Sequence, residues 1–216
     1  MRAGAPAPWA HLRPAERRFT LAEVRRAAEQ LPEPHRPPPP PTARPAAVLV
    51  PIFETGGEAR IILTKRPETM PSHRGEIAFP GGKLEAERDG SLRDAALREA
   101  HEEIGLDPHD VDVVAELDSL TTVASRFVLT PFVGLLDTRP QLHPDPSEVV
   151  SVFDVAISEL LRDDVYREER WDIPPDLGIT PGRDRAIHFF ELSDETVWGA
   201  TARILAGLLA HFTAGR

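Results

Sequence analysis

The sequence predicts an α/β protein in which helices lie on both faces of a mixed β-sheet. Two neighbouring runs, 46–53 and 59–64, are rich in valine, isoleucine and leucine, and a Gly-Gly pair lies between them. This pattern is typical of two strands joined by a tight turn, and the nearly continuous apolar character is that of strands covered on both faces. The segments after Ser91 and after Ser193 instead repeat apolar residues at helical spacing. Strands and helices in this arrangement predict an α/β/α sandwich.

The first 45 residues are expected to form a separate N-terminal segment, and residues 46–216 the main domain. Residues 1–19 show no regular pattern, whereas 20–31 predict a helix in which Thr20 and Glu23 form a capping box. Five consecutive prolines, 37–41, then predict an extended polyproline II stretch. Such a stretch suits a stiff spacer that wraps or links the first helix, and binding of an SH3-like partner is the alternative.

The remaining elements follow from the same two periodicities. Strands are predicted at 76–79, 111–117, 120–123, 127–136, 149–157 and 186–192, with one helical turn at 158–162. The polar stretch 163–184, rich in proline and glycine, is interpreted as a long loop with room for a short strand. The helix after Ser193 has one apolar face, formed by Val197, Thr201, Ile204, Leu208 and Phe212.

Composition and charge restrict the class of protein. The chain has 216 residues, of which 41% are hydrophobic, enough for one substantial core in a monomer or a homodimer. A formal net charge of −10 disfavours nucleic-acid partners that are bound by neutralising phosphates. The absence of cysteine excludes disulfides, thiolate metal sites and cysteine nucleophiles. The N-terminus lacks the apolar core of a secretory signal and no apolar run is long enough to span a membrane, so a cytoplasmic location is expected.

The helix after Ser91 concentrates three carboxylates on one face. Glu99 lies three residues before Glu102 and four before Glu103, and these spacings place side chains on the same side of a helix. Like charges this close repel each other and destabilise a bare helix. A hard divalent cation such as Mg²⁺, which binds carboxylate oxygens, would offset the repulsion. The pattern therefore indicates a metal site, and a solvated acidic face paired with Arg98 is the alternative.

The run from Arg98 to Leu106, Arg-Glu-Ala-His-Glu-Glu-Ile-Gly-Leu, is preceded by a glycine and resembles the Nudix box of the Nudix hydrolases. The resemblance implies the Nudix fold and hydrolysis of a diphosphate linkage with Mg²⁺ or Mn²⁺. It makes Glu99, Glu102 and Glu103 metal ligands and catalytic carboxylates, and Gly82 a ligand through its backbone carbonyl. Arg98 is then a strut that orients a box carboxylate.

One position departs from the family pattern. The pattern has a glutamate six residues after the glycine, where this chain has Arg88, and the 15 residues between Gly82 and Arg98 are more than the pattern allows. An expanded loop of this kind resembles that of one branch, the coenzyme A diphosphatases. Any of three acidic residues could supply the missing carboxylate, and the sequence leaves the choice open among Glu85, Glu87 and Asp89.

Two motifs outside the box bear on the substrate. The run 63–66, Leu-Thr-Lys-Arg, together with Gly75 and 79–82, Phe-Pro-Gly-Gly, is similar to the motif of coenzyme A diphosphatases, although Pro71 replaces one of its arginines. The resemblance implies coenzyme A or a derivative as a small-molecule substrate, cleaved to 3′,5′-ADP and 4′-phosphopantetheine. Side chains expected to bind this substrate are Lys65, Arg66, Arg74, Phe79 and Lys83. The alternatives are ADP-ribose or a nucleoside triphosphate as substrate, or a nucleotide-sensing domain without catalysis.

The general base lies outside the box in some Nudix members and within it in others. Glu148 follows a Pro-Asp-Pro-Ser turn and precedes an apolar run, and in this respect it resembles the extra carboxylate of several branches. We therefore expect Glu148 in the site as a base or metal ligand. A plain surface glutamate at the start of a strand is the alternative.

Overall fold

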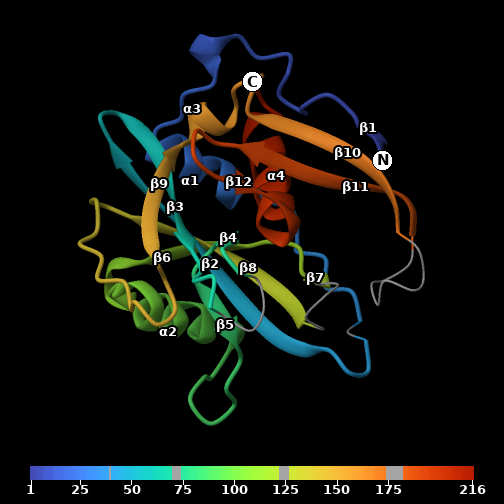
Figure 1. Cartoon of the computed structure of the whole chain (residues 1–216). Helices are drawn as coiled ribbons and strands as arrows, with labels where there is room; N and C mark the ends of the chain where they lie inside the picture. The colour runs from blue at the N-terminus through green and yellow to red at the C-terminus, as the bar shows by residue number, and fades with distance from the viewer. Residues whose placement is uncertain (39, 70–73, 122–126, 174–181) are drawn as a thin grey trace.

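The computed structural model describes residues 1–216 with the exception of 39, 70–73, 122–126 and 174–181. Within the described residues, helices lie on both faces of a mixed sheet, which confirms the predicted fold class (Figure 1). The helix α2 (Leu92–Ile104) covers one face. The opposite face carries α1 (Leu21–Glu29), α3 (Ile157–Leu160) and α4 (Gly199–Thr213).

The described strands form two sheets. In the larger one, β2 and β8 are parallel, the other pairs are antiparallel, and the order is β4-β3-β2-β8-β6, with β5 beside β2, β7 beside β8 and β9 beside β3. Its strands are β2 (Arg44–Thr55), β3 (Glu58–Lys65), β4 (Ile77–Ala78), β5 (Gly81–Lys83), β6 (Asp112–Glu116), β7 (Leu120–Thr121), β8 (Phe127–Leu136) and β9 (Ser151–Ala156). The smaller sheet contains β1 (Arg2–Ala3), β10 (Tyr166–Ile173), β11 (Gly182–Glu191) and β12 (Thr196–Val197) in that order. Two 3-10 helices span Pro14–Glu16 and Pro108–Asp110.

The larger sheet is built around β2, whose central residues are all buried. The predicted hairpin with β3 is present, and Gly56 and Gly57 form its turn with φ of 62° and 72°, values that other residues rarely adopt. At its other end β2 pairs with β5. Gly81 permits this close pairing, because a Cβ at that position would collide with the backbone of Ala47 and Val48. Glycine thus fixes where the strand that leads into α2 lies.

The helix α2 begins and ends where the sequence predicts. The Ser91 hydroxyl accepts a hydrogen bond from the Asp94 backbone N–H at 3.1 Å and donates to the Asp94 carboxylate at 2.8 Å. Gly105 ends the helix in the left-handed conformation, with φ of 68°. Ala100 and Ile104 are buried against the sheet. On the acidic face of the helix, Glu102 remains exposed, whereas Glu103 is buried.

The N-terminal segment is packed into the same core as the sheets. The indole of Trp9 is 0% exposed, and its ring centroid lies 4.9 Å from that of Tyr166 and 6.2 Å from that of Phe190. The predicted capping box of Thr20 and Glu23 is present at the start of α1. The domain boundary expected at residue 45 stays a prediction.

The start of the proline-rich stretch lies along the connection between β6 and β7. The His35 backbone N–H donates to the Asp118 carboxylate at 2.8 Å, and the His35 carbonyl accepts from the Ser119 N–H at 3.0 Å. Arg36 pairs with Glu116 at 2.6 Å. These contacts fit a segment that wraps the domain. Of the five prolines, residue 39 lies outside the described residues.

Residues 163–184 were predicted to form a long loop with room for a short strand, and they contain more strand than predicted. Residues 166–173 form β10, which pairs with β11, and β11 already begins at Gly182. Four consecutive charged residues, 167–170, lie in β10 and form ion pairs, such as that of Arg167 with Glu191 at 2.9 Å. No apolar run therefore marks the strand in the sequence. Residues 174–181 of the predicted loop lie outside the described residues.

The last helix begins later than predicted. Thr196 and Val197 form β12, which pairs with β11, and α4 begins at Gly199. The rest of the predicted apolar face is buried in α4, from Thr201 to Phe212. The strand predicted at 120–123 is present as β7, and its residues 122 and 123 lie outside the described part. Within the described ranges, no helix combines the length and apolar character needed to cross a membrane.

The buried position of Trp9 generates a stability prediction. Trp9→Ala should lower the free energy of unfolding by about 3–5 kcal/mol, because it leaves a cavity among aromatic rings. Trp198→Ala is the matched control, since Trp198 is 44% exposed, and it should change the free energy by only about 0.5 kcal/mol. Urea denaturation followed by circular dichroism measures both. Equal effects of the two substitutions would show that the N-terminal segment is not docked in the core.

Candidate active site

Glu103 is the most buried of the three glutamates on the acidic face of α2. Its side chain is 3% exposed, the Gly81 backbone N–H donates to its Oε2 at 3.1 Å, and an Arg66 nitrogen lies 3.7 Å from its Oε1. Burial raises the pKa of Glu103 to about 7, and the charges of Glu99 and Glu148 add to the rise while Gly81 and Arg66 oppose it. A charged Glu103 is therefore under-compensated, and a bound cation would stabilise it.

Glu99 lies one helical turn before Glu103 and faces Gly82 of β5. A Cβ at residue 82 would collide with the Glu99 carboxylate. Glycine therefore lets the backbone of β5 approach this carboxylate closely. Burial raises the pKa of Glu99, and the neighbouring Arg98 opposes the rise. The structure thus brings together the side chain and the backbone that were predicted to share a metal ion.

Arg98 connects the loop before α2 to the acidic face. Its Nε and Nη2 donate to the two carboxylate oxygens of Asp89 at 2.7 and 2.9 Å, and this pair is buried, with side chains 14% and 1% exposed. Its Nη1 donates to Glu99 at 2.9 Å and to Glu102 at 2.8 Å. The hydrogen bonds from Arg98 lower the pKa of Asp89. Of the three acids left open by the sequence, Asp89 is the one that binds Arg98.

Glu102 is 40% exposed and is shared by two guanidinium groups. It accepts hydrogen bonds from Arg98 and from Arg88, and Arg88 also lies 3.3 Å from Glu85. Partial burial alone would raise the pKa of Glu102, but the two arginines outweigh it and lower the pKa. The sequence marks Arg88 only as a departure from the family pattern. In the structure it binds the acidic cluster, which consists of Glu99, Glu102 and Glu103.

The loop 137–150 is attached to the end of α2. The backbone N–H groups of His143 and Asp145 donate to the carbonyls of Ile104 and Glu103 at 2.8 and 2.9 Å. These two carbonyls belong to the last turn of the helix, where they have no partner within the helix. On its other side the loop joins β3, through a hydrogen bond of 2.8 Å from the Val150 N–H to the Lys65 carbonyl.

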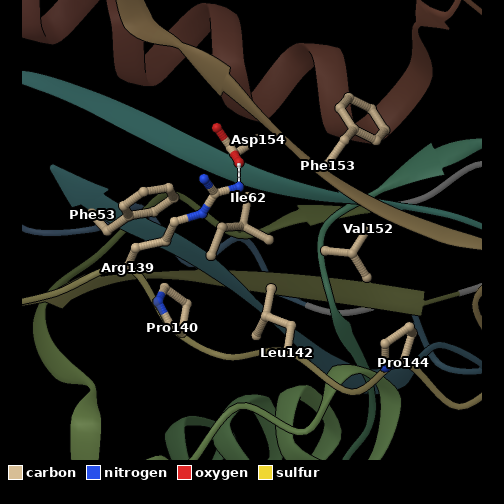
Figure 2. A pocket seen from close by; sticks show the side chains of 9 residues that line it. All are labelled: Phe53, Ile62, Arg139, Pro140, Leu142, Pro144, Val152, Phe153 and Asp154. Atoms are coloured by element: carbon tan, nitrogen blue, oxygen red, sulfur yellow. Dashed lines mark hydrogen bonds and ion pairs between the residues drawn. The ribbon is translucent and has the colours of Figure 1, made fainter. Parts of the chain in front are cut away.

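The first part of the same loop is fixed to β9. Figure 2 shows Arg139 reaching to Asp154, with Phe53 and Leu142 beside it. These residues line a hollow with a volume of about 250 Å³. The ion pair between Arg139 and Asp154 measures 3.0 Å. Neither this hollow nor a larger one of about 500 Å³ beside α4 is lined by a predicted site residue. The predicted site on α2 is therefore not part of either hollow.

Glu148 lies near the end of this anchored loop and is exposed. Its negative charge contributes to the raised pKa of both Glu99 and Glu103. The turn before it is held by the Glu148 N–H, which donates to the Asp145 carbonyl at 3.0 Å. The charge of Glu148 therefore acts on two of the box glutamates, and its role as base or ligand stays a prediction.

The side chains expected to bind substrate differ in whether they lie near the glutamates of α2. Arg66 reaches the cluster through Glu103, whereas the Lys65 ammonium is paired with Glu195 at 2.5 Å. Arg74 and Lys83 are exposed, and the Lys83 carbonyl accepts a hydrogen bond from Arg98. Phe79 is 3% exposed within the core on the face opposite α2, so its side chain is not brought to the glutamates.

Among the described residues, no three acidic or histidine side chains converge closely enough to hold a metal ion as they stand. Two of the three box glutamates, Glu99 and Glu102, are instead paired with the same Arg98 nitrogen. The donor set nevertheless fits a hard divalent cation, because every candidate ligand is an oxygen.

Several contacts of the site were missed by the sequence analysis. Gly81 donates its backbone N–H to Glu103, Glu195 neutralises Lys65, and Arg88 binds Glu102. The first was signalled by the Gly-Gly pair before the box, which permits a close backbone approach. The pairing of Lys65 with Glu195 had no local signal, because the two residues are 130 positions apart and the fold alone brings them together.

Comparisons with known proteins agree with this geometry. The NUDIX domain profile matches residues 43–177. Nudix hydrolase 22, chloroplastic, of Arabidopsis thaliana is 42% identical over 167 residues, which are 74% of this chain and 52% of that protein. Peroxisomal coenzyme A diphosphatase NUDT7 of Mus musculus is 38% identical over 150 residues, 68% of this chain and 59% of that protein. The crystal structure of a MutT/nudix family protein from Enterococcus faecalis is similar with a TM-score of 0.51 at 18% identity, covering 87% of this chain and 67% of that one.

The chain therefore belongs to the Nudix family. It spans about half the length of the plant relative. The resemblance of the box at 98–106 to this family is confirmed, and the bacterial structure supports the fold alone. Nudix hydrolases are enzymes that generally use divalent metal ions.

The raised pKa of Glu103 predicts how metal-free protein responds to pH. The unfolded chain loses this proton near pH 4.5 and the folded chain near pH 7, so the folded state binds more protons in between and stability falls as pH rises through that window. Glu103→Gln removes this loss and keeps the acceptor for the Gly81 N–H. In chelator-treated protein the substitution should raise the free energy of unfolding by on the order of 2–3 kcal/mol at pH 8, and hardly at all at pH 4.5.

Thermal unfolding of the two proteins across pH 4.5–8 measures this difference. Glu33→Gln is the matched control, because Glu33 is exposed on the surface. A stability difference between Glu103→Gln and wild type that does not change with pH would contradict the buried, proton-retaining state of Glu103.

Proposed function

We propose that this chain hydrolyses a diphosphate linkage with Mg²⁺ or Mn²⁺ held by Glu99, Glu102, Glu103, the Gly82 carbonyl and Glu148. The supporting observation is that Glu103 is buried against the Gly81 backbone N–H, while Glu99 of the same helix face lies against Gly82. The charge of Glu103 is under-compensated by Arg66, which is the condition in which a carboxylate binds a hard cation. A domain that only senses nucleotides has no need of all three box glutamates.

A bound divalent ion would neutralise charge on the diphosphate and lower the pKa of an attacking water. The protein's own side chains would then hold the acidic helix face in place and deprotonate the attacking water. Arg98, held by the buried Asp89 carboxylate, fixes the helix face and carries its charge beside Glu99 and Glu102. Glu148 would accept the proton of the water at its carboxylate, since its charge acts on Glu103 and it belongs to a loop anchored to α2.

We propose coenzyme A or a derivative as the substrate, cleaved to 3′,5′-ADP and 4′-phosphopantetheine. Support comes from the runs 63–66 and 79–82, which are similar to the motif of that branch, and from the 38% identity to the mouse coenzyme A diphosphatase. Arg66 stands beside the cluster, where a phosphate oxygen would meet it. The cytoplasmic location expected from the sequence stays a prediction.

A substrate panel tests the proposal. With Mg²⁺ or Mn²⁺ present, coenzyme A should have a higher kcat/KM than dephospho-coenzyme A, ADP-ribose or any nucleoside triphosphate, because its 3′-phosphate adds a charged contact. Product identification by mass spectrometry shows which bond is cleaved. A higher kcat/KM for ADP-ribose would reject the coenzyme A assignment and leave diphosphate hydrolysis standing. No cleavage of any compound in the panel would reject both.

The role of Glu148 can be separated from that of an ordinary surface acid. Glu148→Gln should lower kcat by about 10²-fold or more if the carboxylate deprotonates water. Its KM and its unfolding midpoint should stay near those of wild type, since Glu148 is exposed. Steady-state kinetics measures this, with Glu33→Gln as the control of equal charge change. A kcat within about twofold of wild type would remove Glu148 from the mechanism.

A further inference from the structure

Arg88 occupies an unusual position in the acidic cluster. In the family pattern a glutamate stands six residues after the glycine, and this chain has an arginine there. Its guanidinium hydrogen-bonds Glu102, one of the proposed metal ligands, and lies 3.3 Å from Glu85 in its own loop. A cation of the protein thus binds the carboxylate that a metal ion would need.

The two arginines that bind Glu102 differ in how firmly they are held. Arg98 is 14% exposed and is fixed by two hydrogen bonds to Asp89, which is 1% exposed. Arg88 is 52% exposed, and its partners Glu102 and Glu85 are 40% and 49% exposed. Ion pairs this exposed contribute little to stability, so they exchange easily. Arg98 is therefore a fixed support, whereas Arg88 can leave Glu102 at small cost.

We propose that Arg88 has two partners: Glu102 in the absence of a divalent ion, and the phosphate oxygens of the substrate once Glu102 binds the ion. This inference rests on the proposed metal-dependent function. A doubly charged ion at Glu102 repels the nearby guanidinium, while a diphosphate bound to the same ion places anionic oxygens within its reach. Guanidinium groups bind phosphate by charge-assisted, often bidentate, hydrogen bonds. Arg88 thus competes with the metal before substrate binds and cooperates with it afterwards.

The loop that carries Arg88 gives it the freedom to do this. It connects β5 to α2, and Figure 1 shows it extending away from the body of the protein. Its two ends are fixed, because Asp89 is buried by Arg98 and Lys83 pairs with Ala46 of β2. Between them residues 85–88 are exposed. The side chain of Arg88 can therefore change partner without moving Asp89 or Arg98.

Metal binding without substrate gives the first test. Titration of chelator-treated protein with Mn²⁺, followed by calorimetry, should show affinity roughly two- to fivefold tighter for Arg88→Gln than for wild type, because a competitor for Glu102 is removed. Arg88→Lys keeps the charge and should lie between the two. Arg93→Gln is the matched control: Arg93 is exposed on the first turn of α2, roughly 13 Å along the helix from Glu102, and its loss should leave the affinity unchanged.

Binding of a diphosphate analogue gives the second test. Imidodiphosphate, a non-hydrolysable diphosphate, should bind Mn²⁺-saturated Arg88→Gln about five- to tenfold more weakly than wild type. The two measurements therefore move in opposite directions, and a merely structural role of Arg88 would not produce this. Weakened or unchanged Mn²⁺ binding, or unchanged imidodiphosphate binding, would overturn the inference.

These results are separable from the proposed function. If wild-type protein binds no Mn²⁺, the metal-dependent function fails and this inference fails with it. If wild type binds Mn²⁺ and Arg88→Gln matches it in both titrations, only the role of Arg88 is rejected. If both titrations shift as expected while coenzyme A is not cleaved, the role of Arg88 stands and the substrate assignment is rejected.

Discussion

The contact on which the site depends is the approach of β5 to both β2 and α2. Gly81 pairs with β2 where a Cβ would collide, and its N–H donates to Glu103. Gly82 follows at the carboxylate of Glu99, again where a side chain would collide. Two successive glycines thus allow β5 to lie close to both the central strand β2 and the acidic face of α2. Without them, the helix could still form, but its carboxylates would have no polar backbone beside them.

A second constraint is charge. The acidic face of α2 is not self-sufficient, because like charges at these spacings repel. In the structure, Arg98 and Arg88 compensate Glu99 and Glu102. Glu103 is buried, has one guanidinium nitrogen of Arg66 at 3.7 Å, and keeps a raised pKa. The like charges that lower the stability of this helix face are therefore also the charges that would bind a cation.

Much of the fold could be predicted because its signals are local. The hairpin of β2 and β3, the limits of α2 at Ser91 and Gly105, and the capping box of α1 each depend on residues within a few positions of one another. The strand β10 could not be predicted, since its run of charged residues is typical of an exposed loop. The burial of Trp9 was equally hidden, because it depends on rings of β10 and β11 that follow much later in the chain.

The site shows the same limit. The box glutamates were found from their spacing, yet the choice of Asp89 over Glu85 and Glu87 required the path of the loop, which decides which acid reaches Arg98. The surroundings of Lys65 and Phe79 also came only from the structure.

The loop that carries Glu148 uses its amides to complete the last turn of α2. Helix carbonyls at such an end are exposed to water unless another segment covers them. The loop and the helix terminus therefore open as one cooperative unit, and their amides would exchange with solvent deuterium together. A motion of the whole loop away from α2 would therefore also release the carbonyls of Glu103 and Ile104 at the end of the helix.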